Sequence, residues 1–252
     1  MFRKSGFTLA EDATHVDICN NTRRTAFTLA EVLITLAIIG VVAAMTIPTL
    51  ISDYQEKVTV TKVKKMYSTL SNAYQLYVAN DGTPQYMDWT EEGASKVYNV
   101  FAPYLKIAKD CGTNDQNCIS YSVRRLKDGT DDPAIRKNEY DVVLNDGSSI
   151  SFRGHSDSRY LGVIYYDINT NLAPNQWGYD IFQFMILPER IVPSGEPNDT
   201  IIDGDLGFLD RFETGCAEST ARGYACTAWV IHKGNLDYLK CDNLTWSDNK
   251  CK

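Results

Sequence analysis

The stretch FTLAEVLITLAIIGVVAAMTIPTLI, residues 27–51, decides how the rest of the chain can be arranged. It holds 25 residues and a single charge, Glu31. As a helix rising about 1.5 Å per residue it would be about 37 Å long, more than the roughly 30 Å of a bilayer's hydrocarbon core. A secretory signal peptide has a shorter apolar region that ends at a small-residue cleavage site, whereas this run continues directly into a helical pattern. The segment therefore predicts a membrane anchor.

Glu31 is the anomaly of this segment. A carboxylate near the centre of a bilayer is unfavourable by about 2.5–3.5 kcal/mol on insertion scales, and by less near the interface. The segment itself contains no cation. Two interpretations remain open: Glu31 lies close enough to the interface to stay hydrated, or it pairs with a cation from another chain, such as a free amino terminus.

The cysteines indicate the compartment of the rest of the chain. Six of the seven lie downstream of the anchor as three near-neighbour pairs: Cys111 and Cys118, Cys216 and Cys226, Cys241 and Cys251. No C-x-x-C zinc spacing occurs, so the pattern favours local disulfides in an oxidising compartment over six reduced thiols. The sequence does not fix which of the fifteen pairings forms. Basic residues flank the anchor equally, so the orientation with the head outside the cytoplasm rests on these cysteines.

Residues 23–51, RRTAFTLAEVLITLAIIGVVAAMTIPTLI, resemble the N-terminal signature of type IV pilins and pseudopilins. In that family a prepilin peptidase cuts a basic leader just before a Phe, and the new amino terminus is N-methylated. The resemblance implies cleavage between Ala26 and Phe27, methylation of Phe27, and pairing of Glu31 with the amino terminus of a neighbouring subunit. The family often carries a helix-weakening proline at the depth of Pro48. One departure is Ala26, because the residue before the cut is usually Gly.

An earlier copy of FTLAE opens at Phe7. From Glu11, the last residue of this copy, the chain reads EDATHVDICNNT, which contains three acids and no apolar run. The copy therefore lacks the helix that would present a scissile bond at the bilayer edge. Cutting before Phe27 would also remove Cys19 and leave an even six cysteines. Both observations favour the second copy as the processing signal, with residues 1–26 as the leader.

The resemblance also implies partners and a location. The expected partners are the prepilin peptidase, other pilin or pseudopilin subunits, an inner-membrane assembly platform, and lipid before assembly. Ala37, Gly40 and Ala44 would let neighbouring helices approach in a pilus or type II secretion pseudopilus. We expect a single pass through a bacterial inner membrane with a cytoplasmic N-terminus, then a periplasmic or cell-surface filament. The net charge of −7 disfavours nucleic acid as a partner. Alternatives are an anchored extracytoplasmic binding domain that does not assemble, and a soluble secreted protein.

Beyond the anchor the chain predicts an α+β fold, in which a long hydrophobic-then-amphipathic helix packs on a disulfide-containing head with an antiparallel sheet. An apolar stripe at helical spacing continues the helix over residues 52–80, and residues 81–252 form the globular head. A second helix is predicted over 94–108. YDVVL and SISF flank a hairpin turn at residues 145–148, and LGVIYYDI, YDIFQFMIL and CTAWVIH are read as further strands.

Chemistry-bearing motifs are few. Asp167, Asn169, Asn171 and Asp180 carry oxygen ligands that could hold calcium, as the head loops of some pseudopilins do, but the loop lacks the expected Gly and Glu of a calcium motif, and a plain Asx-rich turn is the alternative. No other cofactor is expected. The chain has no nucleophile elbow, HExxH or P-loop, His155 and His232 are predicted to be solvated, and residues 128–132 an exposed loop. We therefore expect no enzyme.

Overall fold

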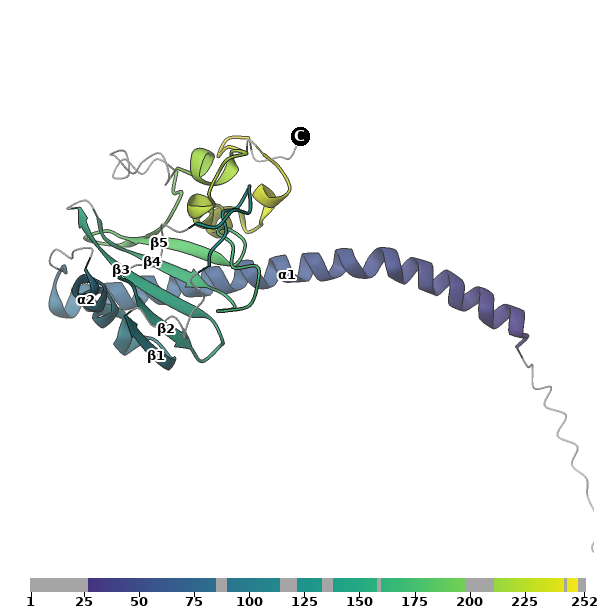
Figure 1. Ribbon diagram of the computed structural model, residues 1–252, viewed down its shortest axis with the longest axis horizontal. Coiled ribbons are helices and arrows are strands. Elements are labelled where there is room, and N and C mark those ends of the chain that lie inside the picture. Colours follow the sequence, from purple (N-terminus) through teal and green to yellow (C-terminus); the bar gives the residue numbers. More distant parts are fainter. Residues whose placement is uncertain are drawn as a thin grey trace, which may run out of the picture. The chain divides into compact units, whose positions relative to one another are not determined.

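The computed structural model describes residues 27–84, 90–113, 122–132, 138–157, 160–197, 211–242 and 244–248. The chain divides between Thr49 and Leu50 into two units. Its first element is the helix α1, Leu29–Asp81, drawn in purple and blue in Figure 1. The helix predicted over residues 27–80 is therefore confirmed to within two residues at each end.

The ends of α1 have local causes. At its start, Thr28 and Glu31 form reciprocal hydrogen bonds with each other. At its end, Gly82 adopts a positive φ of 81° and donates its amide to the carbonyl of Val78. Glycine takes this left-handed conformation without steric penalty, which makes it a common residue just past a helix end. The predicted stop at residues 80–82 is confirmed.

The head contains a six-stranded antiparallel sheet in which every strand pairs with its neighbour in sequence. The strands are β1 Ile107–Thr113, β2 Tyr140–Leu144, β3 Ser149–Asp157, β4 Tyr160–Asp167, β5 Ile181–Ile186 and β6 Ile191–Pro193. The Asp146-Gly147 turn joins β2 to β3 as predicted, with Gly147 at a φ of 81°. β1 and β6 were not anticipated from the sequence.

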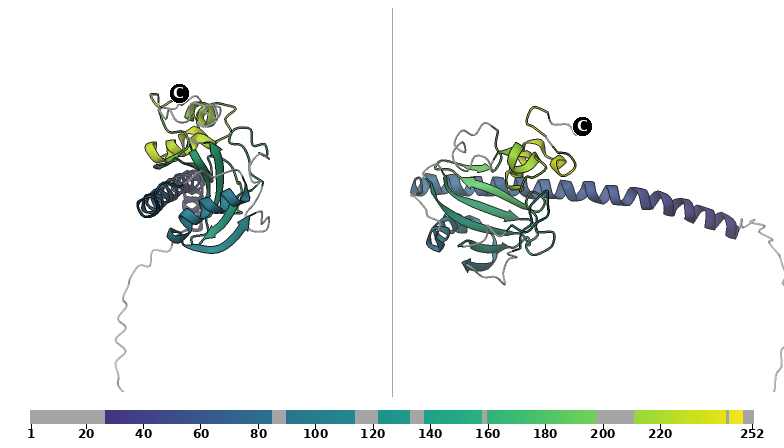
Figure 2. Two further views of the ribbon diagram at one scale, coloured as in Figure 1. Left: turned by 90° about the vertical axis from the view of Figure 1, so that its left-hand side faces the viewer. Right: turned by 45° about the horizontal axis from the view of Figure 1, so that its top comes forward.

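One face of the sheet is covered by helices. The C-terminal part of α1 buries Val63, Leu70 and Tyr74 in a core that it shares with Phe152 and Phe184 of the sheet. The helix α2, Glu91–Phe101, lies against the same core and is capped by Thr90, whose hydroxyl accepts the Gly93 amide. The predicted helix over 94–108 ends earlier, because residues 102–104 form a 3-10 turn and Ile107 begins β1. Figure 2 shows α1, α2 and the sheet from two further directions.

The opposite face of the sheet buries a second cluster. Tyr165 and Met185 of the sheet pack there with Val123, Trp177 and Tyr224 from loops far apart in the sequence. The ring of Trp177 meets those of Tyr165 and Tyr224 edge-on, at centroid distances of 5.3 Å and 4.7 Å. Both faces are therefore buried, which explains why β4 is buried along its whole length.

The segment CTAWVIH forms a helix and not the predicted strand. Its first residue, Cys226, ends the short turn Tyr224–Cys226, and the rest lies in α4, Thr227–Lys233. The short helical turn Glu213–Ala217 precedes both. Thr227, Ala228, Trp229 and Val230 are all buried, so the β-branched and aromatic composition reflects burial and not strand pairing. Gly234 ends α4 at a φ of 71° by donating its amide to the Val230 carbonyl.

Candidate functional site

The candidate site is the start of α1, where Glu31 and Thr28 contact each other. The Thr28 amide and hydroxyl both donate to Glu31 Oε2, at 2.8 Å and 2.9 Å. The Glu31 amide in turn donates to Thr28 Oγ1 at 3.2 Å. This is a capping box, in which the residue before the helix and the third helical residue satisfy each other's backbone amides. It holds the carboxylate against Thr28, the residue that follows Phe27.

The helix surface that follows is apolar and uncovered within its own chain. From Leu29 to Leu50 every residue is exposed except Ala43, which is half-buried. The stretch is long and apolar enough to cross a membrane, by length and composition. Its threonine hydroxyls do not need water, because Thr35, Thr46 and Thr49 donate to carbonyls of the same helix at 2.8–3.0 Å. The surface therefore suits a hydrocarbon environment or the apolar faces of other helices.

Small residues interrupt this surface where close packing was predicted. A Cβ added to Gly40 would have no neighbour within 4 Å in this chain, so the glycine leaves an open notch. Ala37 and Ala44 lie within one turn of it on either side. Pro48 lies inside α1 and has no amide to donate to the Ala44 carbonyl, so the helix lacks one backbone bond there. Ala26 and the first FTLAE copy lie outside the described residues.

The head contains the expected oxidised cysteines. Cys216 and Cys226 form a disulfide across ten residues and both are fully buried. Cys111 and Cys241 are disulfide-bonded as well. Cys118 and Cys251, their expected near neighbours, lie outside the described residues.

The four predicted calcium ligands belong to a turn in which aspartate carboxylates accept hydrogen bonds from backbone amides of the same turn. Asp180 accepts the amides of Asn175 and Gln176 at 3.0 Å and 2.6 Å, and Asp167 accepts the amide of Asn169 at 3.0 Å. Burial raises the pKa of Asp180 despite these bonds. Within the described residues no group of three or more His, Cys, Asp or Glu side chains could hold a metal ion. The contacts fit an Asx-rich turn, and calcium binding stays a prediction.

Neither described histidine shows a catalytic arrangement. His155 lies in β3, is 6% exposed and contacts the Tyr160 hydroxyl, so the prediction that it is solvated was wrong. It is buried because the second face of the sheet is covered. His232 lies in the last turn of α4, and its Nε2 is 2.9 Å from Glu196 Oε1.

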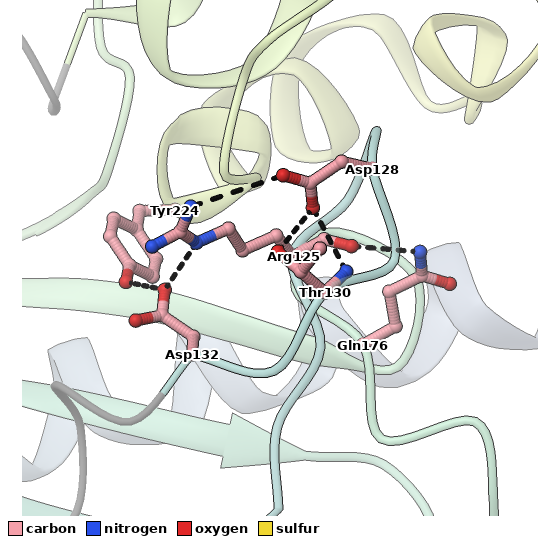
Figure 3. A network of polar contacts seen from close by, with 6 residues as sticks. All are labelled: Arg125, Asp128, Thr130, Asp132, Gln176 and Tyr224. Carbon is pink, nitrogen blue, oxygen red and sulfur yellow. Dashed lines mark hydrogen bonds and ion pairs between the residues drawn. The ribbon is translucent and has the colours of Figure 1, made fainter.

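A partly buried ionic network joins the loops over the second face of the sheet (Figure 3). Arg125 lies 3.8 Å from Asp132 and 3.9 Å from Asp128, and Gln176 donates to the Arg125 carbonyl at 3.1 Å. Tyr224 donates its hydroxyl to Asp132. Burial raises the pKa of Tyr224, and the bond to Asp132 raises it further, so the phenol stays a donor. Residues 128–131 are exposed, as predicted for this loop. Asp132 is the exception: it is fully buried, which indicates a structural role.

Sequence reasoning also missed a cavity of about 360 Å³ beside the first turns of α1 in the head unit. Its walls include Tyr54, Ile168 and Tyr179, and the ion pair of Glu56 with Lys240 lies at its edge. Burial raises the pKa of Glu56, but hydrogen bonds from Lys240 and Leu236 outweigh it and the net pKa is lowered. No local signal marks this pair, because its members are 184 residues apart.

Comparison with known families separates the two units. A model of the prokaryotic N-terminal methylation motif matches residues 21–47, which is the prepilin signature of type IV pilins. A second model, described as a family of unknown function (DUF6613), matches residues 49–235, most of the chain.

The chain belongs to this family. It carries the prepilin signature in front of the region that the family model matches. The two matched regions are separated only by Pro48, close to the division of the structure between Thr49 and Leu50. The chain is thus a type IV pilin-like precursor, and its N-terminal apolar helix suits a single-pass membrane anchor. No curated protein and no solved structure matches it.

Proposed function

We propose that this chain is a structural subunit of a pilin-like filament, either a type IV pilus or a type II secretion pseudopilus. A prepilin peptidase cuts between Ala26 and Phe27, and the new amino terminus is methylated. The subunit is held in the inner membrane by α1 and then passes into a filament. The observation that carries this proposal is the prepilin signature with Glu31 held at the start of an uncovered apolar helix.

In the filament, Glu31 meets the amine of Phe27 from a neighbouring subunit. A buried carboxylate is tolerated when a cation and hydrogen bonds compensate its lost hydration. The exposed aliphatic side chains on either side of Gly40 pack against other subunits' helices, and the notch at Gly40 lets two helices approach closely. The chain acts by assembly and not by catalysis.

The disulfide between Cys216 and Cys226 supports an extracytoplasmic head and a cytoplasmic N-terminus. Disulfides persist in the periplasm and outside the cell, whereas thiols stay reduced in the cytosol. With six cysteines downstream of the anchor and at least four of them oxidised, the head belongs on the oxidising side of the membrane.

The test is the amino terminus of the protein recovered from host membranes and from sheared filaments, read by intact mass and terminal peptide sequencing. The proposal expects a chain that starts at methylated Phe27 in both fractions. A chain that still starts at Met1 and never enters the filament fraction would overturn it, and would favour an anchored extracytoplasmic binding domain. The matched control is Ala26→Lys, a variant designed to block cleavage before Phe27, which should be recovered with its amino terminus at Met1.

A further inference from the structure

The exposed large hydrophobic side chains of the head gather in one place. Among the described residues beyond Ile51, the exposed ones are Tyr54, Leu76, Leu172 and Tyr179. Tyr54 and Tyr179 line the cavity beside the first turns of α1 in the head unit, and Leu172 directly precedes Ala173, which lines it too. We call Tyr54, Leu172 and Tyr179 the rim patch. Their exposed fractions of 67%, 68% and 42% show that the head's own core does not use them.

The loop that carries Leu172 and Tyr179 is tied to α1 and to itself. Lys62 of α1 donates from Nζ to the Ile168 carbonyl at 2.9 Å, where the loop begins. The Leu172 amide donates to the Asn169 carbonyl at 3.3 Å, and the Asp180 carboxylate accepts two amides of the same loop. The rim patch is therefore ordered before it meets a partner, so little conformational entropy opposes binding.

The rim patch begins where the apolar run of α1 ends. Residues 32–51 rise about 30 Å as a helix, which matches the hydrocarbon core of a bilayer. Tyr54 lies three residues beyond Ile51 in the same helix, which places it about 4.5 Å further along the axis. The headgroup region adds about 5–7 Å on each side of the core. Tyrosine is enriched at this depth, because its ring contacts hydrocarbon while its hydroxyl reaches water.

We propose that the rim patch contacts the bilayer that holds α1, and that its three side chains enter the headgroup region beside the helix. Exposed hydrophobic residues that occur singly are ordinary on a protein surface, whereas a cluster marks a contact with another surface. Here that surface is lipid, because the cluster continues the membrane-spanning run of α1. The inference goes beyond the proposed function, because it concerns the subunit held in the membrane and applies whether or not the chain assembles.

The charges beside the rim patch indicate which property of the bilayer it recognises. The cavity lining contains two acids, Glu56 and Asp180, and one base, Lys240. Glu56 and Lys240 pair with each other at 2.8 Å, and Asp180 accepts backbone amides. Binding therefore depends on apolar burial and not on attraction to lipid phosphates. We expect neutral and anionic lipids to serve equally, with little dependence on salt.

The first experiment is photo-crosslinking of the full chain in phosphatidylcholine nanodiscs. The photoreactive residue p-benzoylphenylalanine replaces Leu172, the matched control Leu76, or Ile39 in the apolar run, one position per sample. Leu76 is an exposed leucine of α1 that lies about 37 Å beyond Ile51 along the helix axis. We expect mass spectrometry to find phospholipid adducts at positions 39 and 172, with a yield at 172 about tenfold above that at 76.

Three outcomes of this experiment would contradict the proposal. Equal adduct yields at positions 172 and 76 would show that the rim patch does not contact lipid. A cross-link at 172 to a second copy of the chain, in place of lipid, would assign the patch to a contact between subunits. A chain without adducts at position 39 would not be anchored by α1, and the inference would fall with the anchor.

The second experiment asks whether the three side chains act as one surface. In the chain that carries the photoreactive residue at 172, Tyr54→Gln with Tyr179→Gln should lower the lipid-adduct yield about tenfold, while Trp at both positions should preserve it. Both tyrosines are exposed, so the melting temperature of the head should not change in either variant. An unchanged yield in the Gln variant, or a yield that requires anionic phosphatidylglycerol and falls with salt, would refute binding by apolar burial.

The proposed function and this inference are tested in different samples. Filaments read the amino terminus of the assembled chain, whereas nanodiscs read the membrane contact of the head. A chain that is cut and assembled but gives no adduct at position 172 would leave the proposed function standing and refute only the inference.

Discussion

Lys240 contacts Glu56 at 2.8 Å and so ties the C-terminal segment of the head to α1. The second oxygen of the Glu56 carboxylate accepts the Leu236 amide at 2.9 Å, so both oxygens hold the same segment. The pair lies beside the cavity at the first turns of α1 in the head unit. Glu56 thereby holds the segment from Leu236 to Lys240 against α1.

We expect this contact to make the stability of the head depend on pH. The net pKa of Glu56 is lowered in the folded state, so its contribution is present above the unfolded pKa of about 4.3 and is lost as the pH falls through the folded pKa. Glu56→Gln should lower the free energy of unfolding by about 0.5–1 kcal/mol at pH 7. The difference from the wild type should shrink as the pH falls below about 4.

The measurement is urea unfolding of the full chain in micelles at pH 7 and at a pH below about 4. The matched control is Glu92→Gln, which removes an exposed pair with Lys96 at 2.9 Å and should change nothing measurable. A Glu56→Gln variant as stable as the wild type at pH 7 would contradict the assignment.

The disulfide between Cys216 and Cys226 should stabilise the head strongly. It closes a loop of ten residues, for which the chain-entropy estimate is about 2.5–3 kcal/mol. The double variant Cys216→Ala with Cys226→Ala keeps the buried site apolar and should lose about this free energy in urea unfolding. Loss of less than about 1 kcal/mol would show that the bridge constrains the unfolded chain little.

Local patterns identified α1 and most of the sheet in advance. The stripe through Val63, Leu70 and Tyr74 repeats at helical spacing, and the Asp146-Gly147 turn dictates the hairpin between β2 and β3. These features are encoded within a few residues, so one sequence suffices to find them. The contact of Thr28 with Glu31 is equally local, because the T-x-x-E spacing is a capping-box signal.

Elements that depend on tertiary contacts could not be found in this way. α4 was read as a strand from its composition, although Gly234 and the preceding basic residues His232 and Lys233 are helix C-terminal signals that would have corrected the reading. The burial of Asp132 depends on Tyr224, 92 residues away, which no local pattern reveals. The contact of Glu56 with Lys240 is long-range for the same reason.

Gly195 should tolerate no side chain. It has a φ of +93°, and an added Cβ would lie 2.0 Å from the carbonyl oxygen of Ala225. Gly195→Ala should therefore destabilise the head by more than about 3 kcal/mol, since the obstacle is backbone and the conformation is left-handed. The control is Gly129→Ala, which has a φ of +64° but open space and should lose only about 1–2 kcal/mol. The measurement is the melting temperature of each variant in thermal unfolding, which should be lower for Gly195→Ala than for Gly129→Ala. Equal melting temperatures would contradict the prediction.

We expect chelation to leave the head's stability unchanged. Asp180 already accepts the amides of Asn175 and Gln176, so its carboxylate is bound by the backbone of the turn without an ion. The melting temperature of the full chain should be the same in EDTA and in millimolar calcium. A rise of several degrees in calcium, absent in Asp167→Asn, would instead assign a calcium site to this loop.

Gly40 should matter for assembly and not for the stability of the head. The open space around it means that a side chain meets nothing within its own chain, so Gly40→Leu should leave the melting temperature of the head unchanged. In a filament the same side chain would fill the notch between neighbouring helices and hold them apart. We therefore expect Gly40→Leu to be inserted and cut before Phe27 as the wild type is, yet to be depleted from sheared filaments. Gly40→Ala adds a single methyl group and should assemble nearly normally. If Gly40→Leu assembles as well as Gly40→Ala, the helices do not pack at this position.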